Sequence, residues 1–188
     1  MCHFITGTLP RAAARTVLAP ILREHGLAFS ALDNPFVQAQ LAPGDAYSRA
    51  TKAWCDCGTP LGSARRGRGA VAQDGAHVAR MKEALRKKGW GSAKIERWLV
   101  QQARTRERDE RVRKDHDAAN AAYLETWRDA LAALARTAGP VGLLLHWYHG
   151  GLETERIEIA RREPVALRSL DVAALAGIEE DMLYVFAE

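Results

Sequence analysis

The most constraining feature of this sequence is a long stretch that contains neither glycine nor proline. It extends from Ser92 to Ala138 and is bounded by Gly91 and Gly139. Nothing in it interrupts helical geometry, and as one helix it would be about 70 Å long at 1.5 Å per residue. Such a rod cannot pack wholly on a small domain. We therefore expect either that it projects or that it breaks near Asp115–Asn120.

Apolar residues at helical spacing support this prediction and extend the helical block towards the N-terminus. Asp74 can cap a helix over Ala76–Lys88, and Ser92 can cap the next one. Residues three and four apart would form the buried faces of these helices. They are Met81 and Leu85 in the first, Ile95, Trp98, Leu99 and Ala103 in the second, and Tyr123, Leu124, Trp127, Leu131 and Leu134 near its end.

Strand-like patterns occur on both sides of the helical block. Five segments show the alternation or the short apolar runs of strands: Cys2–Leu9, Ala46–Trp54, Val141–His149, Glu155–Ala160 and Met182–Phe186. We predict an α+β fold, one domain over residues 1–188, with a single mixed or antiparallel sheet built from N- and C-terminal strands. A large helical insertion, a helical hairpin or one long helix, would lie between them at about 75–138.

Shorter elements are predicted from local signals. The Val141–His149 and Glu155–Ala160 segments, joined by a glycine pair, predict a β-hairpin. The alternation in Phe36–Leu41 suits another strand. Asp171 falls in the first turn of a short helix over Ser169–Gly177.

Composition limits the class of protein. The chain has 188 residues, of which 47% are hydrophobic and 27% charged, as in ordinary globular proteins. No apolar run approaches the roughly 18 residues of a membrane span, and Arg11 and Arg15 fall where a secretory signal would be apolar. We expect a cytoplasmic protein with no membrane partner, and the abundance of Ala and Arg is typical of bacterial coding with high GC content.

The three cysteines are the strongest candidates for chemistry. Cys55 and Cys57 stand one residue apart in "WCDCGTPLG", and the third is Cys2. On an extended strand, residues i and i+2 point to the same side, so both sulfurs would face one atom, with Gly58 turning the chain away. If the first two predicted strands are antiparallel neighbours, the start of one lies beside the end of the other. Cys2 would then join the pair.

Thiolates in this arrangement suit a metal, and zinc is the leading expectation because it takes four Cys or His ligands in a tetrahedron. His3 follows Cys2 directly and would face the other way on a regular strand. His149, in the "HGG" turn, is freer to swing than His146. We predict a zinc site made by Cys2, Cys55, Cys57 and one of His3 or His149.

Two alternatives use the thiols as reactive groups, and a third treats them as ordinary buried residues. Cys55 and Cys57 can serve as redox thiols. Cys2 can serve as an N-terminal nucleophile if Met1 is removed, with its own amine as base. The opening Met-Cys resembles that of class II glutamine amidotransferases, whose processed cysteine is the nucleophile, although His3 stands where that family has glycine.

Charge suggests how the protein meets other molecules. The net charge is +4, and the basic, glycine-rich segment at 62–75 predicts a mobile loop. The charged run Arg104–Asp117 has six Lys or Arg and five Asp or Glu, so it suits a solvated helix face better than a grip on phosphates. We therefore expect a small metal-binding protein that acts by binding a protein partner, in a regulatory or toxin-neutralising role. An enzyme and a nucleic-acid binder are the alternatives.

Overall fold

The computed structural model describes residues 1–13, 15–50, 54–61 and 75–188. The predicted basic loop at 62–75 lies outside these residues except for Gly75, so its mobility stays a prediction. Elements in the first part of the chain are β1 (Cys2–Pro10), α1 (Arg15–Glu24), β2 (Ser30–Ala31), α2 (Pro35–Gln38) and β3 (Asp45–Arg49). Later elements are α3 (Gly75–Lys87), α4 (Ser92–Ala138), β4 (Val141–Tyr148), β5 (Arg161–Ala166), a 3-10 turn (Leu167–Ser169), α5 (Val172–Ala176) and β6 (Met182–Ala187).

The chain divides into two compact units. Met1–Arg66 and Asn120–Glu188 form the first unit, and Gly67–Ala119 forms the second. The first unit holds every strand, together with the end of α4; the second holds α3 and the beginning of α4. The Gly- and Pro-free stretch is one uninterrupted helix, so the break considered near Asp115–Asn120 does not occur. No helix in the described part of the chain is both long and apolar enough to cross a membrane.

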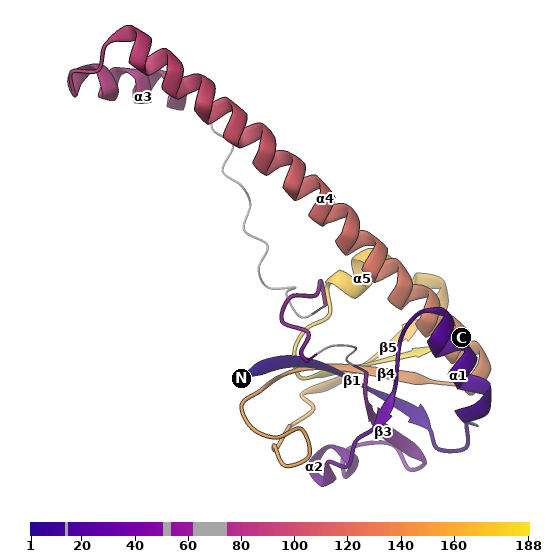
Figure 1. The fold of residues 1–188 in the computed structure, drawn as a ribbon. Coiled ribbons are helices and arrows are strands. Elements are labelled where there is room, and N and C mark those ends of the chain that lie inside the picture. The colour runs from indigo at the N-terminus through magenta and orange to yellow at the C-terminus, as the bar shows by residue number, and fades with distance from the viewer. Residues whose placement is uncertain (14, 51–53, 62–74) are drawn as a thin grey trace. The chain divides into compact units, whose positions relative to one another are not determined.

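A mixed six-stranded sheet forms the centre of the first unit (Figure 1). Its strand order is β2-β3-β1-β4-β6-β5. β1 pairs antiparallel with β3 on one side, from Thr6↔Arg49 to Pro10↔Asp45, and with β4 on the other. Among the strand pairs of the described residues, β5 and β6 alone run parallel. The predicted α+β class is thus confirmed, with N- and C-terminal strands in one sheet and a long helix between them in sequence.

Both faces of the sheet are buried, which is why its central strands read as nearly continuous apolar runs. On one face, Ile5, Leu143 and Phe186 pack with Trp127 and Leu131 of α4. The opposite face carries a second cluster, which joins Tyr47, Leu144, Tyr148 and Leu183 of the strands to Val37 of α2 and to Ile157. Thus the apolar face predicted near the end of the long helix is the one that covers the sheet.

The segment predicted as a strand at Glu155–Ala160 is not one, and it forms no hairpin with β4. β5 begins at Arg161 and pairs in parallel with β6. Side chains provide hydrogen bonds for the irregular segment: Asn34 donates to the carbonyls of Leu152 and Glu155, and Gln40 bonds Ile157 and Ile159. The alternating sequence pattern reflects the burial of Ile157, which is 3% exposed, and this burial occurs outside a strand.

The strand predicted at Phe36–Leu41 is also wrong, because α2 begins there. The Asn34 side chain accepts hydrogen bonds from the backbone N–H groups of Phe36 and Val37, and Pro35 occupies the first helical turn. Such a side-chain cap is a usual start of a helix. Proline is tolerated in the first turn because the N–H groups there have no acceptor within the helix. Strand β3 is likewise shorter than the predicted Ala46–Trp54 and ends at Arg49.

Because β1, β4 and β6 are in close contact at Gly142, this position has no room for a side chain. A methyl group at Gly142 would collide with the side chain of Thr8 and lie 2.9 Å from Leu183 Cδ1. We expect Gly142→Ala to lower the free energy of unfolding by about 1–3 kcal/mol, the usual cost of overpacking. Urea unfolding measures this. Gly58→Ala is the control, because a methyl group there has no atom within 4 Å; equal losses in both variants would contradict the packing argument.

Candidate metal centre

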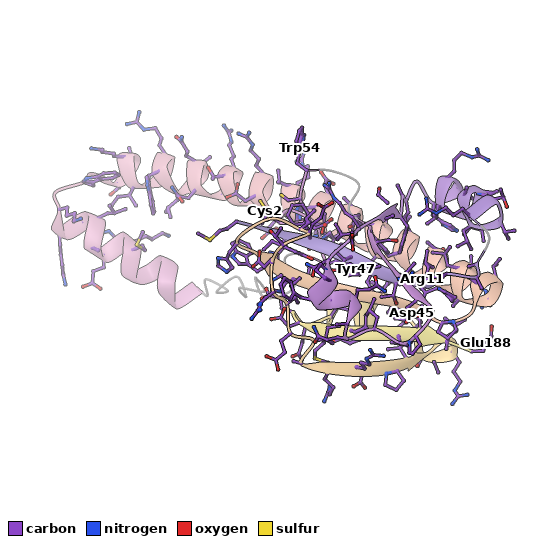
Figure 2. The ribbon with its side chains drawn as sticks, turned by 90° about the horizontal axis from the view of Figure 1, so that it is seen from below. Cys2, Arg11, Asp45, Tyr47, Trp54 and Glu188 are labelled. Atoms are coloured by element: carbon purple, nitrogen blue, oxygen red, sulfur yellow. The ribbon has the colours of Figure 1, made fainter. Side chains whose placement is uncertain are left out.

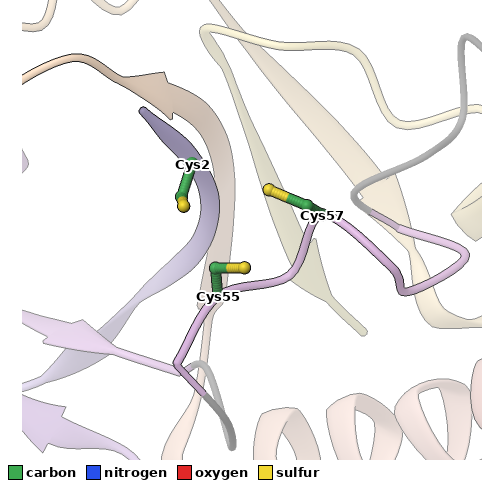
Figure 3. A group of neighbouring side chains, drawn as sticks. All are labelled: Cys2, Cys55 and Cys57. Carbon is green, nitrogen blue, oxygen red and sulfur yellow. The ribbon is translucent and has the colours of Figure 1, made fainter.

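The three cysteines meet at one end of the sheet. Their sulfur atoms all lie within 4.8 Å of one another, and all three residues are half-buried. Figure 3 shows the three side chains converging on a common space, Cys2 from β1 and the other two from the segment that follows β3. Among the described residues these form a group close enough to bind a metal ion.

β3 ends at Arg49, and in the described part of the chain no strand pairs with the first half of β1 on that side. Four backbone groups, the N–H and C=O of His3 and of Ile5, face this edge. The Ile5 carbonyl accepts from Ala50 N, and the His3 carbonyl from Asp56 N. The Ile5 N–H donates to Asp56 Oδ2 at 2.8 Å, and the His3 N–H donates to Cys57 Sγ at 3.1 Å. Side chains of the 55–57 segment therefore complete the edge.

Asp56 anchors this arrangement. Its side chain is buried, with the residue only 3% exposed, and it carries the acceptor for Ile5. Its carbonyl closes a turn by accepting from both the N–H and the hydroxyl of Thr59. The buried Asp56 carboxylate and the Cys57 sulfur both accept hydrogen bonds from β1, so together they fix the 55–57 segment against the start of this strand.

The predicted gathering of sulfurs is present, but the predicted reason for it is wrong. Cys55 and Cys57 lie in an irregular turn rather than at the end of a strand. Gly58 does not have a positive φ, and a side chain there would meet open space, so glycine's conformational freedom does not turn the chain. The turn is made by Asp56 and Thr59.

The thiols influence one another strongly. The Cys57 backbone N–H and the neighbouring thiols donate to the Cys55 sulfur, and they lower the pKa of Cys55 despite its partial burial. The pKa of Cys2 is raised, first because its thiol is a hydrogen-bond donor to Cys55, and then by desolvation and the nearby sulfur charges. Thiolates this close repel one another, and a cation bound between them would favour their ionised forms.

The three-cysteine group contains neither of the predicted histidine ligands, so the fourth ligand stays a prediction. The His3 ring faces the other side of β1, where Nε2 lies 2.6 Å from Glu180 Oε1 and the ring packs edge-on against Trp147. His149 is exposed, and its backbone N–H donates to the Glu155 carboxylate. His146 Nδ1 contacts Asp181, whose φ of 62° is unusual for a residue other than glycine.

Two relevant residues were not predicted from the sequence. The one sequence feature that could have pointed to Asp56 is its position between two cysteines. Trp54 is of a type that usually packs in the core, yet it is 95% exposed, and Figure 2 shows its side chain projecting from the fold.

Comparison of the chain with protein-family models, curated proteins and solved structures finds no match.

The depressed pKa of Cys55 and the raised pKa of Cys2 predict an order of reactivity. Thiolate is the nucleophilic form, so in chelator-treated protein Cys55 should react with iodoacetamide at a lower pH than Cys2 does. Labelling at a series of pH values on both sides of the ordinary thiol pKa of about 8.5, followed by peptide mass spectrometry, measures both onsets. Labelling of Cys2 before Cys55 would contradict the direction of the hydrogen bond between the two thiols.

Asp56 should matter for stability more than its small size suggests. Asp56→Ala removes the acceptor of the Ile5 N–H, and we expect a loss of about 1.5–3 kcal/mol in the free energy of unfolding. Asp56→Asn keeps an oxygen acceptor and should lose less. Urea unfolding, with hydrogen exchange at Ile5, measures both variants. Equal stability of Asp56→Ala and the unmodified protein would show that the turn is held by other contacts.

Proposed function

We propose that Cys2, Cys55 and Cys57 bind one zinc ion and that the metal pins the turn after β3 to the start of β1. The observation that carries this is the convergence of the three sulfurs within 4.8 Å. In tetrahedral zinc with Zn–S of about 2.3 Å, the sulfurs are about 3.8 Å apart. The thiols therefore need to close by about 1 Å or less, a small adjustment for side chains in a turn.

The donor set favours zinc over harder metals. Thiolates select zinc, Cu(I) or iron–sulfur clusters, whereas calcium and magnesium prefer oxygen ligands. The His3 N–H bond to Cys57 and the Cys57 N–H bond to Cys55 supply the outer hydrogen bonds that stabilise metal-bound thiolates. A reducing compartment such as the cytoplasm would keep all three as thiols.

We propose His149 as the fourth ligand. Cys2 pairs with Tyr148 across β1 and β4, which puts His149 one residue beyond the partner of Cys2. The exposed ring of His149 can rotate, since only its backbone N–H is tied down, by Glu155. His3 is the alternative, but its ring would have to leave both Glu180 and Trp147.

The metal would serve protein binding through Trp54. This side chain is 95% exposed and directly precedes the ligand Cys55. Exposed tryptophans are frequent centres of protein interfaces. A zinc ion that immobilises Cys55 also restricts Trp54 before the partner arrives, which reduces the entropy lost on binding. We infer a protein that acts by occupying the surface of a regulatory partner.

Metal content tests the zinc proposal. Protein purified without chelator and without a metal-binding tag should contain about one zinc per chain. Cys55→Ser and Cys2→Ser should lower zinc content and melting temperature together, because the metal binds only the folded chain. His116→Ala in α4 is the control and should keep its zinc. Three freely titrating thiols and no stoichiometric metal would contradict the proposal and favour the redox or nucleophile alternatives.

His149→Ala and His3→Ala then identify the fourth ligand. The absorption spectrum of cobalt-substituted protein depends on the metal ligands. We expect this spectrum to change in His149→Ala and to stay unchanged in His3→Ala. If the cobalt absorption spectrum is unchanged in both variants, neither histidine is a ligand. The site would then consist of the three thiolates and a solvent molecule.

Loss of Trp54 tests the partner proposal separately. A protein that co-purifies with the unmodified chain should be lost with Trp54→Ala and after zinc removal. It should be retained with Val17→Ala, a control that shortens another exposed apolar side chain, 51% exposed, in the same unit. Retention by Trp54→Ala would place the interface elsewhere.

A further inference from the structure

A pocket of about 370 Å³ lies between α1 and the β1–β3 part of the sheet, among residues separate from the cysteines. Its apolar walls come from three places: Leu18, Ala19 and Leu22 of α1, Leu9 and Ala46 of the two strands, and Phe29. Sites for small ligands usually have volumes of about 300–1,000 Å³ and mainly apolar walls. This pocket meets both conditions.

The hollow exists because the residues beneath α1 are small. Ala46 and Ser48 line it from β3, and Ala13 and Ala19 from the α1 side. On β1, a methyl group at Gly7 would lie only 2.5 Å from Phe29 Cε1, so the Phe29 ring occupies the space of a Gly7 side chain. Larger residues at these positions would fill the space with core packing.

Two guanidinium groups border the apolar pocket. Arg11 and Arg15 both line it and are both exposed, so the pocket opens to solvent beside two positive charges. Arg11 Nε donates to the Asp45 carbonyl at 3.1 Å, which holds the side chain in place, and Figure 2 shows these residues together. Among the ion pairs of the described residues, neither arginine is matched with a carboxylate.

We propose that this pocket binds a single-chain anionic amphiphile, with its hydrocarbon chain between α1 and the sheet and its anionic head on Arg11 and Arg15. Apart from Ser48, the uncharged side chains that line the pocket are apolar and suit a hydrocarbon chain, and the two positive charges at the opening complement one anionic head. A fatty carboxylate is the simplest such ligand. An alkyl phosphate shares the same chemistry, so both heads belong in the test.

Chain length and head charge should contribute separately. Each methylene group buried from water should tighten binding about fourfold until the pocket is full. Each exposed guanidinium should add about two- to fivefold for a charged head, and this part should weaken as salt is raised. A ligand with an uncharged head group should gain affinity only from the burial of its hydrocarbon chain.

Calorimetry with hexanoate, octanoate and decanoate, then with decyl phosphate, decanol and decyltrimethylammonium, tests the proposal. Decanoate or decyl phosphate should bind more tightly than decanol, and the cation should bind most weakly. The tighter of the two anions identifies the head. Arg15→Gln should weaken decanoate about two- to fivefold and leave decanol unchanged. Arg23→Gln is the matched control, because it removes a charge from α1 outside the pocket.

A pocket-filling variant tests the chain-binding part. Ala19 is exposed on α1, so Ala19→Leu should fold while it narrows the pocket, and it should weaken decanoate and decanol alike. Zinc content should stay at the unmodified value in every variant, which separates this proposal from the metal site. Equal binding of decanoate and decanol, no dependence on chain length, or full binding by Ala19→Leu would each overturn the proposal.

Discussion

Strand β1 needs a hydrogen-bonding partner along both of its edges, and most of the structure follows from how these partners are supplied. On one edge β4 pairs with it from Cys2↔Tyr148 to Thr8↔Gly142, which joins segments separated by the whole helical block. On the other edge β3 accompanies only the second half, up to Arg49. A buried strand cannot leave its peptide groups without partners, because each such loss costs free energy comparable to a hydrogen bond.

The cysteine site is the consequence of that short β3. Asp56 and Cys57 supply the hydrogen bonds that a longer strand would have made to His3 and Ile5. In doing so they bring two sulfurs to the third on β1. Side chains also bond to backbone groups after β4, where Asn34 and Gln40 make hydrogen bonds to the segment from Leu152 to Ile159. Polar side chains thus replace strands at two places in this fold.

The end of the cysteine turn is tied to the apolar core by Leu61, which is 1% exposed. A metal that links Cys2 to Cys55 and Cys57 would add the rigidity that a strand would otherwise have provided. Trp54 directly precedes this turn and exposes a large apolar side chain to solvent.

The sequence by itself determined the parts that depend on local pattern. The α+β class, the terminal strands, the Gly- and Pro-free helix and the cysteines as the candidate site could all be predicted, since periodicity and composition express them directly. The tertiary structure decided what depends on partners distant in sequence. The alternation at Glu155–Ala160 was that of a strand, yet side chains from Asn34 and Gln40 took the place of its neighbour. The sulfurs meet because Asp56 and Cys57 are hydrogen-bonded to β1, a contact between segments about fifty residues apart. No local pattern records such a choice, because the free energy that decides it belongs to contacts formed only when the sheet assembles.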